Sequence, residues 1–217
     1  SNMVGRGSGG DFTISPLVKV WNNKNDISDL TNLGTAWVTP DRNADPFVSG
    51  CNNLAVHAAN QIAIATGQEV RLILVAKGNT SISQWFSASV RQPMLYRISA
   101  VLAAAGVTTL DGFWWHQGEA DNSATAAGYY PGRWNALINC LTSDGVITSS
   151  TPVVMGEVST KYGTIPGVLQ SIADADPRIR LAPVKQFERL TDDVHFTGPE
   201  LVRIGLVYAG LQQLLAS

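Results

Sequence analysis

Hydrophobic residues occur along the chain in two patterns, short dense runs and longer stretches with helical spacing. Residues 70–76 (Val-Arg-Leu-Ile-Leu-Val-Ala) form a nearly continuous apolar run, which is typical of a strand buried on both faces. Apolar positions in residues 54–66 recur on one side of a helix. Asn52 or Asn53 can cap the start of this helix, and Gly67 can end it.

The same two patterns continue through the rest of the chain. Apolar runs predict strands, and helical periodicity predicts helices, at the following positions: strands at 17–21, 112–115, 152–158 and 179–184, and helices at 93–105, 129–141, 165–173 and 200–215. Residues 22–50 are polar and rich in turn residues, which predicts a long surface loop. The alternation of strands and helices predicts an α/β fold, a three-layer α/β/α sandwich with a mostly parallel sheet.

Length, composition and charge narrow the class of protein. A chain of 217 residues with 45% hydrophobic and 15% charged residues fits one α/β domain with a substantial core. A net charge of −2 without a cluster of basic residues argues against nucleic-acid binding. The apolar runs are too short to span a membrane, so no membrane insertion is expected. Cys51 and Cys140 form neither a disulfide framework nor a metal-binding spacing.

Chemically reactive residues follow three of the predicted strands, in residues 78–80, 116–121 and 192–195. Ligands bind beyond the carboxyl ends of parallel strands, so we expect these segments to converge on one site. In the last segment, Asp192 can hold one ring nitrogen of His195 while the other nitrogen faces a nucleophile. The alternative is that Asp192 caps a turn and His195 is a surface residue. The three segments together favour the catalytic interpretation.

Residues 115–121 (Trp-His-Gln-Gly-Glu-Ala-Asp) and 192–198 (Asp-Asp-Val-His-Phe-Thr-Gly) resemble motifs of the SGNH-hydrolase superfamily. The resemblance is to its branch of sialate O-acetylesterases and carbohydrate esterase family six. The nucleophile motif of that branch reads Gly-Gln-Ser-Asn-Met followed by a glycine, and this chain begins Ser-Asn-Met-Val-Gly. Ser-Asn is also what a cleaved tag leaves, but the match continues through Gly7. Gly50 and residues 75–82 match the intervening blocks.

The resemblance implies a fold and a set of roles. Residues 1–217 would be a single SGNH-like, flavodoxin-like domain whose first strand lies N-terminal to Ser1. Ser1 would be the nucleophile, His195 its general base, and Asp192 the residue that orients His195. The backbone amides of Ser1 and Gly50, with the side-chain amide of Gln117, would form the oxyanion hole. Four more residues would support the site or bind substrate: Glu119, Asp121, Asn53 and Trp85.

Rival interpretations exist for the residues after the third strand. In one alternative, Gln117 caps a turn and has no catalytic role. In another, His116 joins Glu119 and Asp121 in an oxygen-rich metal site. A Ser-His-Asp triad needs no metal, so the sequence predicts no metal and no cofactor.

The predicted activity is that of a serine esterase removing O-acetyl groups from a carbohydrate or polysaccharide. An alternative of another class is a catalytically idle carbohydrate-binding domain of a phage tail or cell-surface protein. A lipase-like esterase is a third, which tryptophan-rich and asparagine-rich loops disfavour. The complete Ser, Gln, Asp and His set favours the enzyme. The sequence leaves open the sugar, the ester position, the oligomeric state and the location, whether secreted, cytoplasmic or virion-associated.

Overall fold

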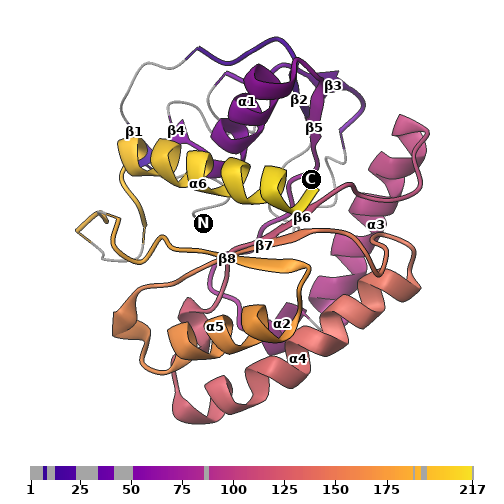
Figure 1. Ribbon diagram of the computed structural model, residues 1–217. Coiled ribbons are helices and arrows are strands. Elements are labelled where there is room, and N and C mark those ends of the chain that lie inside the picture. The colour runs from indigo at the N-terminus through magenta and orange to yellow at the C-terminus, as the bar shows by residue number, and fades with distance from the viewer. Residues whose placement is uncertain are drawn as a thin grey trace. The chain divides into compact units, whose positions relative to one another are not determined.

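The computed structural model describes residues 7–8, 13–22, 34–41, 51–85, 88–187, 189–191 and 195–216. The helices are α1 (Leu54–Thr66), α2 (Ile82–Trp85), α3 (Ala88–Ala105), α4 (Ala124–Ser143), α5 (Ile165–Ala175) and α6 (Gly198–Ala216), with 3-10 turns η1 (Glu119–Asp121) and η2 (Thr160–Tyr162). The strands are β1 (Gly7–Ser8), β2 (Val18–Trp21), β3 (Trp37–Val38), β4 (Cys51–Asn52), β5 (Val70–Leu72), β6 (Phe113–Trp115), β7 (Val153–Gly156) and β8 (Ile179–Ala182). These elements form two compact units, described here one at a time (Figure 1).

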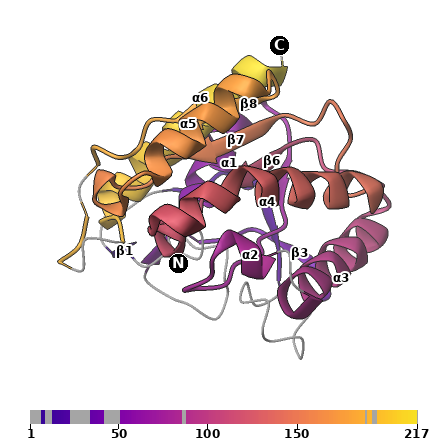
Figure 2. The ribbon, with the colours of Figure 1, turned by 90° about the horizontal axis from the view of Figure 1, so that it is seen from below.

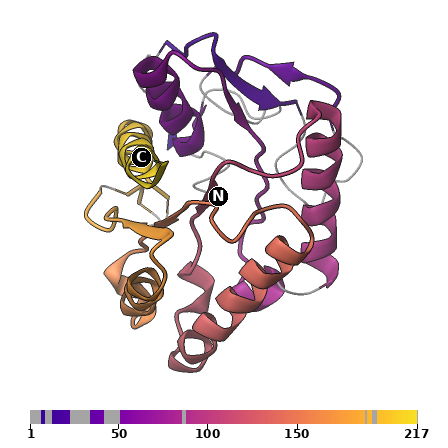
Figure 3. The ribbon, with the colours of Figure 1, turned by 45° about the vertical axis from the view of Figure 1, so that its right-hand side comes forward.

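The first unit comprises the described parts of residues 1–78 and 187–214. Its sheet has the order β3-β2-β5, in which β2 runs antiparallel to β3 and parallel to β5. Strands β1 and β4 form a separate antiparallel pair with Gly7 opposite Asn52. Helix α1 covers the sheet, because Ala59 and Ala63 pack on Val18 of β2 (Figure 3). The core of this unit therefore lies between α1 and the β2–β5 strands.

Helices α1 and α6 lie side by side in the first unit (Figure 1). Gly205 of α6 allows this approach, because a Cβ atom there would lie 2.7 Å from the Cβ of His57 and 2.8 Å from the carbonyl oxygen of Leu54. Contacts so short do not occur between real side chains and backbone, so the packing requires glycine.

The second unit comprises residues 79–186 and the end of the chain. Its sheet is the parallel array β6-β7-β8, with Phe113 opposite Val153 and Met155 opposite Leu181. The middle strand, β7, is buried throughout. Helices α4 and α5 lie on the same side of this sheet (Figures 1 and 2). The core between them contains an aromatic cluster: Trp85, Phe113, Trp115 and Trp134.

The predicted α/β class is confirmed, since β2 and β5, β6 and β7, and β7 and β8 all pair in parallel. Among the described residues no ladder joins β5 to β6. The single domain over residues 1–217 and the strand ahead of Ser1 stay predictions.

Several predicted boundaries were wrong for identifiable reasons. The run at 70–76 forms a strand only over Val70–Leu72, and these residues are half-buried or exposed; among the described strands β5 pairs with β2 and lies at an edge of the order. Helix α4 begins five residues before the predicted 129, at Ala124, because Ser123 caps it and the helix continues through Pro131. Strand β3 lies inside the predicted long loop.

No helix among the described residues has both the length and the apolar character needed to cross a membrane.

Candidate active site

The loop that follows β6 carries the residue predicted to stabilise the oxyanion, Gln117. Strand β6 ends at Trp115, and the chain turns at Gly118 into η1. Gly118 has a φ of 149°, and a Cβ atom there would lie 2.8 Å from Cγ2 of Ile165. A residue with a side chain would be strained and crowded at this position. The glycine therefore permits the turn that leaves Gln117 buried, with 8% of its surface exposed.

The side-chain amide of Gln117 donates two hydrogen bonds inside the protein. Its Nε2 lies 2.6 Å from Oδ2 of Asp121 and 2.9 Å from the carbonyl oxygen of Thr80. An amide nitrogen carries two hydrogens, so both have acceptors in this arrangement. The structure thus brings together two of the three segments expected to converge, residues 78–80 and 116–121, through Thr80 and Gln117.

The acceptor end of the same amide faces a buried tyrosine on α4. Oη of Tyr130 donates to Oε1 of Gln117 at 2.9 Å and also lies 3.1 Å from the Gln117 carbonyl oxygen. Nε1 of Trp115 donates to this hydroxyl at 3.1 Å. Tyr130 was not among the predicted site residues. Its signal in the sequence is a helical stripe shared with Trp134 and Leu137, both buried, since a buried tyrosine hydroxyl needs a partner.

Asp121 is buried, with 1% of its surface exposed, and its Oδ2 also accepts from the backbone N–H of Ile82 at 2.9 Å. Burial raises the pKa of Asp121 because it disfavours the charged form. The hydrogen bonds from Gln117 and Ile82 oppose this rise, and the nearby charge of Glu119 adds to it. Asp121 therefore links the loop after β6 to the start of α2.

Trp85, predicted to support the site or to bind substrate, lies in the aromatic core with 5% of its surface exposed. Its ring packs edge-on against Trp115 with centroids 5.4 Å apart. Its Nε1 donates to Oγ1 of Thr80 at 2.9 Å. In this structure Trp85 is hydrogen-bonded to the segment that contains Thr80 and helps to hold it in place.

Glu119 lies beside His116, with 3.8 Å between Oε1 and Nε2. The side chain of His116 is buried, and that of Glu119 is half-buried. Within the part of the chain that the structure describes, no three histidine, cysteine, aspartate or glutamate side chains lie close enough together to hold a metal ion. The metal interpretation of this loop gains no support from the geometry.

His195 lies in a half-buried segment directly before α6. Its carbonyl oxygen accepts from the backbone N–H of Leu190 at 2.6 Å, and the next residue, Phe196, forms an antiparallel bridge with Arg189. The Phe196 ring is buried, and the Arg189 guanidinium lies 4.6 Å from its centroid. Backbone contacts and the buried Phe196 ring thus contribute to holding the segment.

Asn53 is buried and caps α1, accepting from the backbone N–H groups of Ala55 at 2.8 Å and Val56 at 3.3 Å. Its neighbour Asn52 is also buried, with Oδ1 3.0 Å from Nε2 of His57. This confirms the predicted helix cap. The remaining predicted site residues, Ser1, Gly50 and Asp192, lie outside the described residues.

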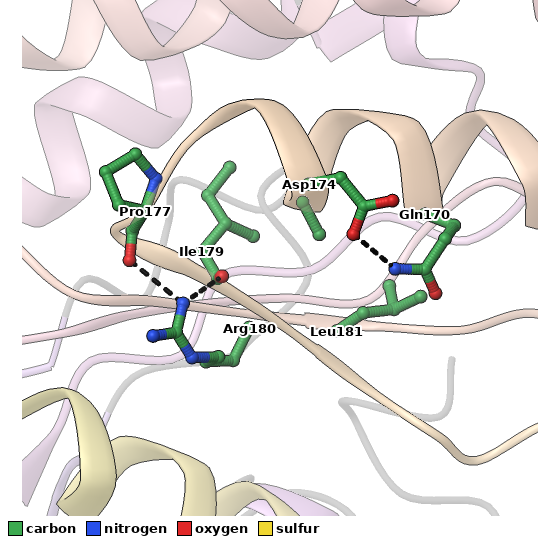
Figure 4. A pocket seen from close by; sticks show the side chains of 7 residues that line it. Gln170, Asp174, Pro177, Ile179, Arg180 and Leu181 are labelled. Carbon is green, nitrogen blue, oxygen red and sulfur yellow. Dashed lines mark hydrogen bonds between the residues drawn. The ribbon is translucent and has the colours of Figure 1, made fainter.

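A cavity of about 390 Å³ opens between α5 and β8 (Figure 4). Its polar groups are paired with one another: Nε2 of Gln170 donates to Asp174 at 2.8 Å, and Arg180 donates to two backbone carbonyls (Figure 4). It is lined by Gln170, Ala173, Asp174, Pro177, Ile179, Arg180 and Leu181. None of the predicted site residues lines this cavity.

Comparisons with known proteins place these features in a family context. The family model described as carbohydrate esterase, sialic acid-specific acetylesterase, matches residues 1–213. No curated protein matches the chain in sequence.

Solved structures share the fold at low sequence identity. A protein from Arabidopsis thaliana has a TM-score of 0.78 and 17% identity, with 98% of this chain and 94% of that chain covered. A carbohydrate acetylesterase from Xanthomonas citri has a TM-score of 0.66 and 13% identity, covering 92% of this chain and 50% of that chain. The protein NanS has a TM-score of 0.65 and 12% identity, with 100% of this chain and 93% of that chain covered.

Proposed function

Because the chain belongs to the carbohydrate esterase family of sialic acid-specific acetylesterases and is a carboxylic ester hydrolase, we propose that it removes O-acetyl groups from carbohydrate through Ser1, His195 and Asp192. The family match confirms the resemblance seen in the sequence. The observation that carries the proposal is the extent of the family match, since residues 1–213 include the nucleophile motif, the Gln117 loop and His195 together.

The proposed reaction proceeds through an acetyl-enzyme. Oγ of Ser1 attacks the acetyl carbonyl carbon while His195 takes the hydroxyl proton, and Asp192 holds the imidazole in position. The bond from the acetyl carbon to the sugar oxygen then breaks, and His195 returns the proton to that oxygen. His195 then deprotonates a water molecule, and the hydroxide attacks the acetyl carbon. The bond from that carbon to Oγ of Ser1 breaks, His195 returns the proton to Oγ, and acetate is released.

The oxyanion in each step would be stabilised by the backbone amides of Ser1 and Gly50 and by the Gln117 side chain. Both Nε2 hydrogens of Gln117 have acceptors and the amide is planar, so one N–H would have to be shared between its present acceptor and the oxyanion. We assign this role to the hydrogen directed at Thr80, whose bond measures 2.9 Å. The bond to Oδ2 of Asp121, at 2.6 Å, is shorter, so it would persist.

The pairing of β1 with β4 supports the shared site of Ser1 and Gly50. Gly7 lies opposite Asn52, and Ser8 lies opposite Cys51. The strand that follows the nucleophile motif is therefore hydrogen-bonded to the strand that follows Gly50. Neighbouring strands of this kind would let two backbone amides serve one oxygen atom.

The proposal is tested by acetate release from an O-acetylated sialic acid and by hydrolysis of 4-nitrophenyl acetate. We expect His195→Ala and Ser1→Ala each to lower kcat about a thousandfold, because each removes a partner in proton transfer or attack. A serine-reactive phosphonate should label the wild-type protein, and mass mapping should place the label on Ser1. Circular dichroism of each variant controls for folding.

Three outcomes would contradict the proposal in different ways. A label on another serine would keep the esterase and remove Ser1 as its nucleophile. Full activity of folded His195→Ala would exclude the proposed base. Binding of the acetylated sugar without any hydrolysis or labelling would favour a carbohydrate-binding protein.

A further inference from the structure

The buried hydroxyl of Tyr130 has a defined direction of hydrogen bonding. The indole N–H of Trp115 can only donate, so Oη of Tyr130 is the acceptor of that bond. The single hydrogen of the hydroxyl must then point to an acceptor. The acceptors beside it are Oε1 of Gln117, at 2.9 Å, and the Gln117 carbonyl oxygen, at 3.1 Å.

The opposite end of the Gln117 amide faces groups of the other kind. The Thr80 carbonyl only accepts, and Oδ2 of Asp121 already accepts from the backbone of Ile82. A reversed amide would place Oε1 against these two oxygens, and the hydroxyl hydrogen would keep only the Gln117 carbonyl oxygen as its acceptor. One orientation therefore satisfies every group, and it directs Nε2 toward Thr80 and Asp121.

Burial makes this orientation depend on Tyr130. The tyrosine has 0% of its surface exposed, so water cannot replace a lost hydrogen bond at the hydroxyl. Burial also raises the pKa of Tyr130 well above its ordinary value, so the hydroxyl keeps its proton. The ring is fixed by α4, where Trp134 and Leu137 are buried as well.

We propose that Tyr130 is a positioning residue, which fixes the Gln117 amide with its N–H groups in the orientation that can serve the oxyanion. The catalytic consequence rests on the proposed function of Gln117. The orientation itself is a property of the buried network and can be tested without any activity.

The chain offers a matched control for removal of the hydroxyl. Tyr129 precedes Tyr130 on α4 and has 64% of its surface exposed. We expect Tyr130→Phe to lower kcat on 4-nitrophenyl acetate about tenfold with little change in KM, a fraction of what loss of an oxyanion donor costs. Tyr129→Phe should leave both constants unchanged. Equal kcat values for these two variants would overturn the catalytic part of the proposal.

A double-mutant cycle distinguishes positioning from a general structural effect. If Tyr130 acts through Gln117, Tyr130→Phe should lower kcat in the wild-type background and have no further effect when Gln117 is already leucine. An equal fall in both backgrounds, measured where all variants are folded, would overturn the proposal.

Nuclear magnetic resonance gives a readout independent of catalysis. The Gln117 side-chain NH₂ signals, assigned by their loss in Gln117→Leu, should exchange slowly with solvent in the wild type and in Tyr129→Phe. In Tyr130→Phe they should shift and exchange faster. Unchanged signals would overturn the positioning role. Shifted signals in a protein without esterase activity would support that role and instead contradict the proposed function.

Discussion

The loop after β6 and the segment before α6 both carry predicted site residues, but the protein holds them by different means. Gln117 is fixed by buried side-chain hydrogen bonds to Tyr130 and Asp121 and by one to a backbone carbonyl. His195 is held by a backbone hydrogen bond and by the buried ring of its neighbour Phe196. The direction of single hydrogens matters in the first region, and the packing of a buried ring contributes to the second.

This difference determines how each region fails. Removing one atom from the Gln117 network leaves a buried polar group without a partner and changes an orientation. In the His195 segment, loss of the buried Phe196 ring would remove packing. Stability should therefore respond most at the His195 segment, and orientation should respond most at the Gln117 loop.

The largest effect on stability is expected from Phe196→Ala. Deleting this buried ring leaves a cavity and should lower the free energy of unfolding by about 3–5 kcal/mol. Urea denaturation measures the change. Phe196→Leu, which keeps much of the volume, should cost less. A loss below about 1 kcal/mol for the alanine variant would show that packing does not hold the segment.

Gly205→Ala tests the helix that follows the same segment, with an intermediate effect. The added methyl group meets α1 at 2.7–2.9 Å, and overpacking of this kind costs about 1–3 kcal/mol. Gly210→Ala is the control in the same helix, because a Cβ atom there meets nothing within 4 Å. That variant should gain up to about 1 kcal/mol from helix propensity. Similar changes in melting temperature for both variants would contradict the close packing of α1 and α6.

The smallest effect is expected from Asp121→Asn and appears as a dependence on pH. Because burial raises the pKa of Asp121 above its ordinary 3.8, the folded protein holds this proton more tightly than the unfolded chain. Its contribution to stability is full below pH 3.8 and is lost as the pH rises through the folded-state pKa.

Asparagine can keep an oxygen toward Gln117 and Ile82 but does not titrate. The variant should therefore lack the Asp121 part of the pH dependence, which urea denaturation across acidic pH measures. The same slope in both proteins would show that Asp121 does not titrate as its burial implies.

Residue types and their spacing along the sequence predicted much of the fold. Asn53 caps α1, and Gly67, with a φ of 68°, ends it, as their residue types predict. The start of α4 could not be placed, because Pro131 argues against a helix that tertiary packing nevertheless maintains. The apolar run at 70–76 is buried at Leu74 and Ala76 but not over Val70–Leu72, because among the described strands β5 pairs on one side only, with β2, and the sequence does not encode this position.

For the site, too, the sequence predicted some contacts and not others. Residue types at strand ends correctly associated Thr80 with Gln117, which are now seen to be hydrogen-bonded. Tyr130 could not be connected to them from spacing, because its hydroxyl meets Gln117 only through the packing of α4. Hydrogen-bond direction is a property of three-dimensional neighbours, and no periodicity in the sequence encodes it.

The one-way order of bonds from Trp115 through Tyr130 and Gln117 to Asp121 also bears on how the protein can evolve. A residue without a side-chain N–H at position 115 would free the tyrosine hydroxyl to turn, and the constraint on the amide would then weaken. A single substitution at one of these positions would leave a buried polar group of the network without a hydrogen-bond partner. Among relatives, these four positions are therefore expected to change together or to remain fixed together.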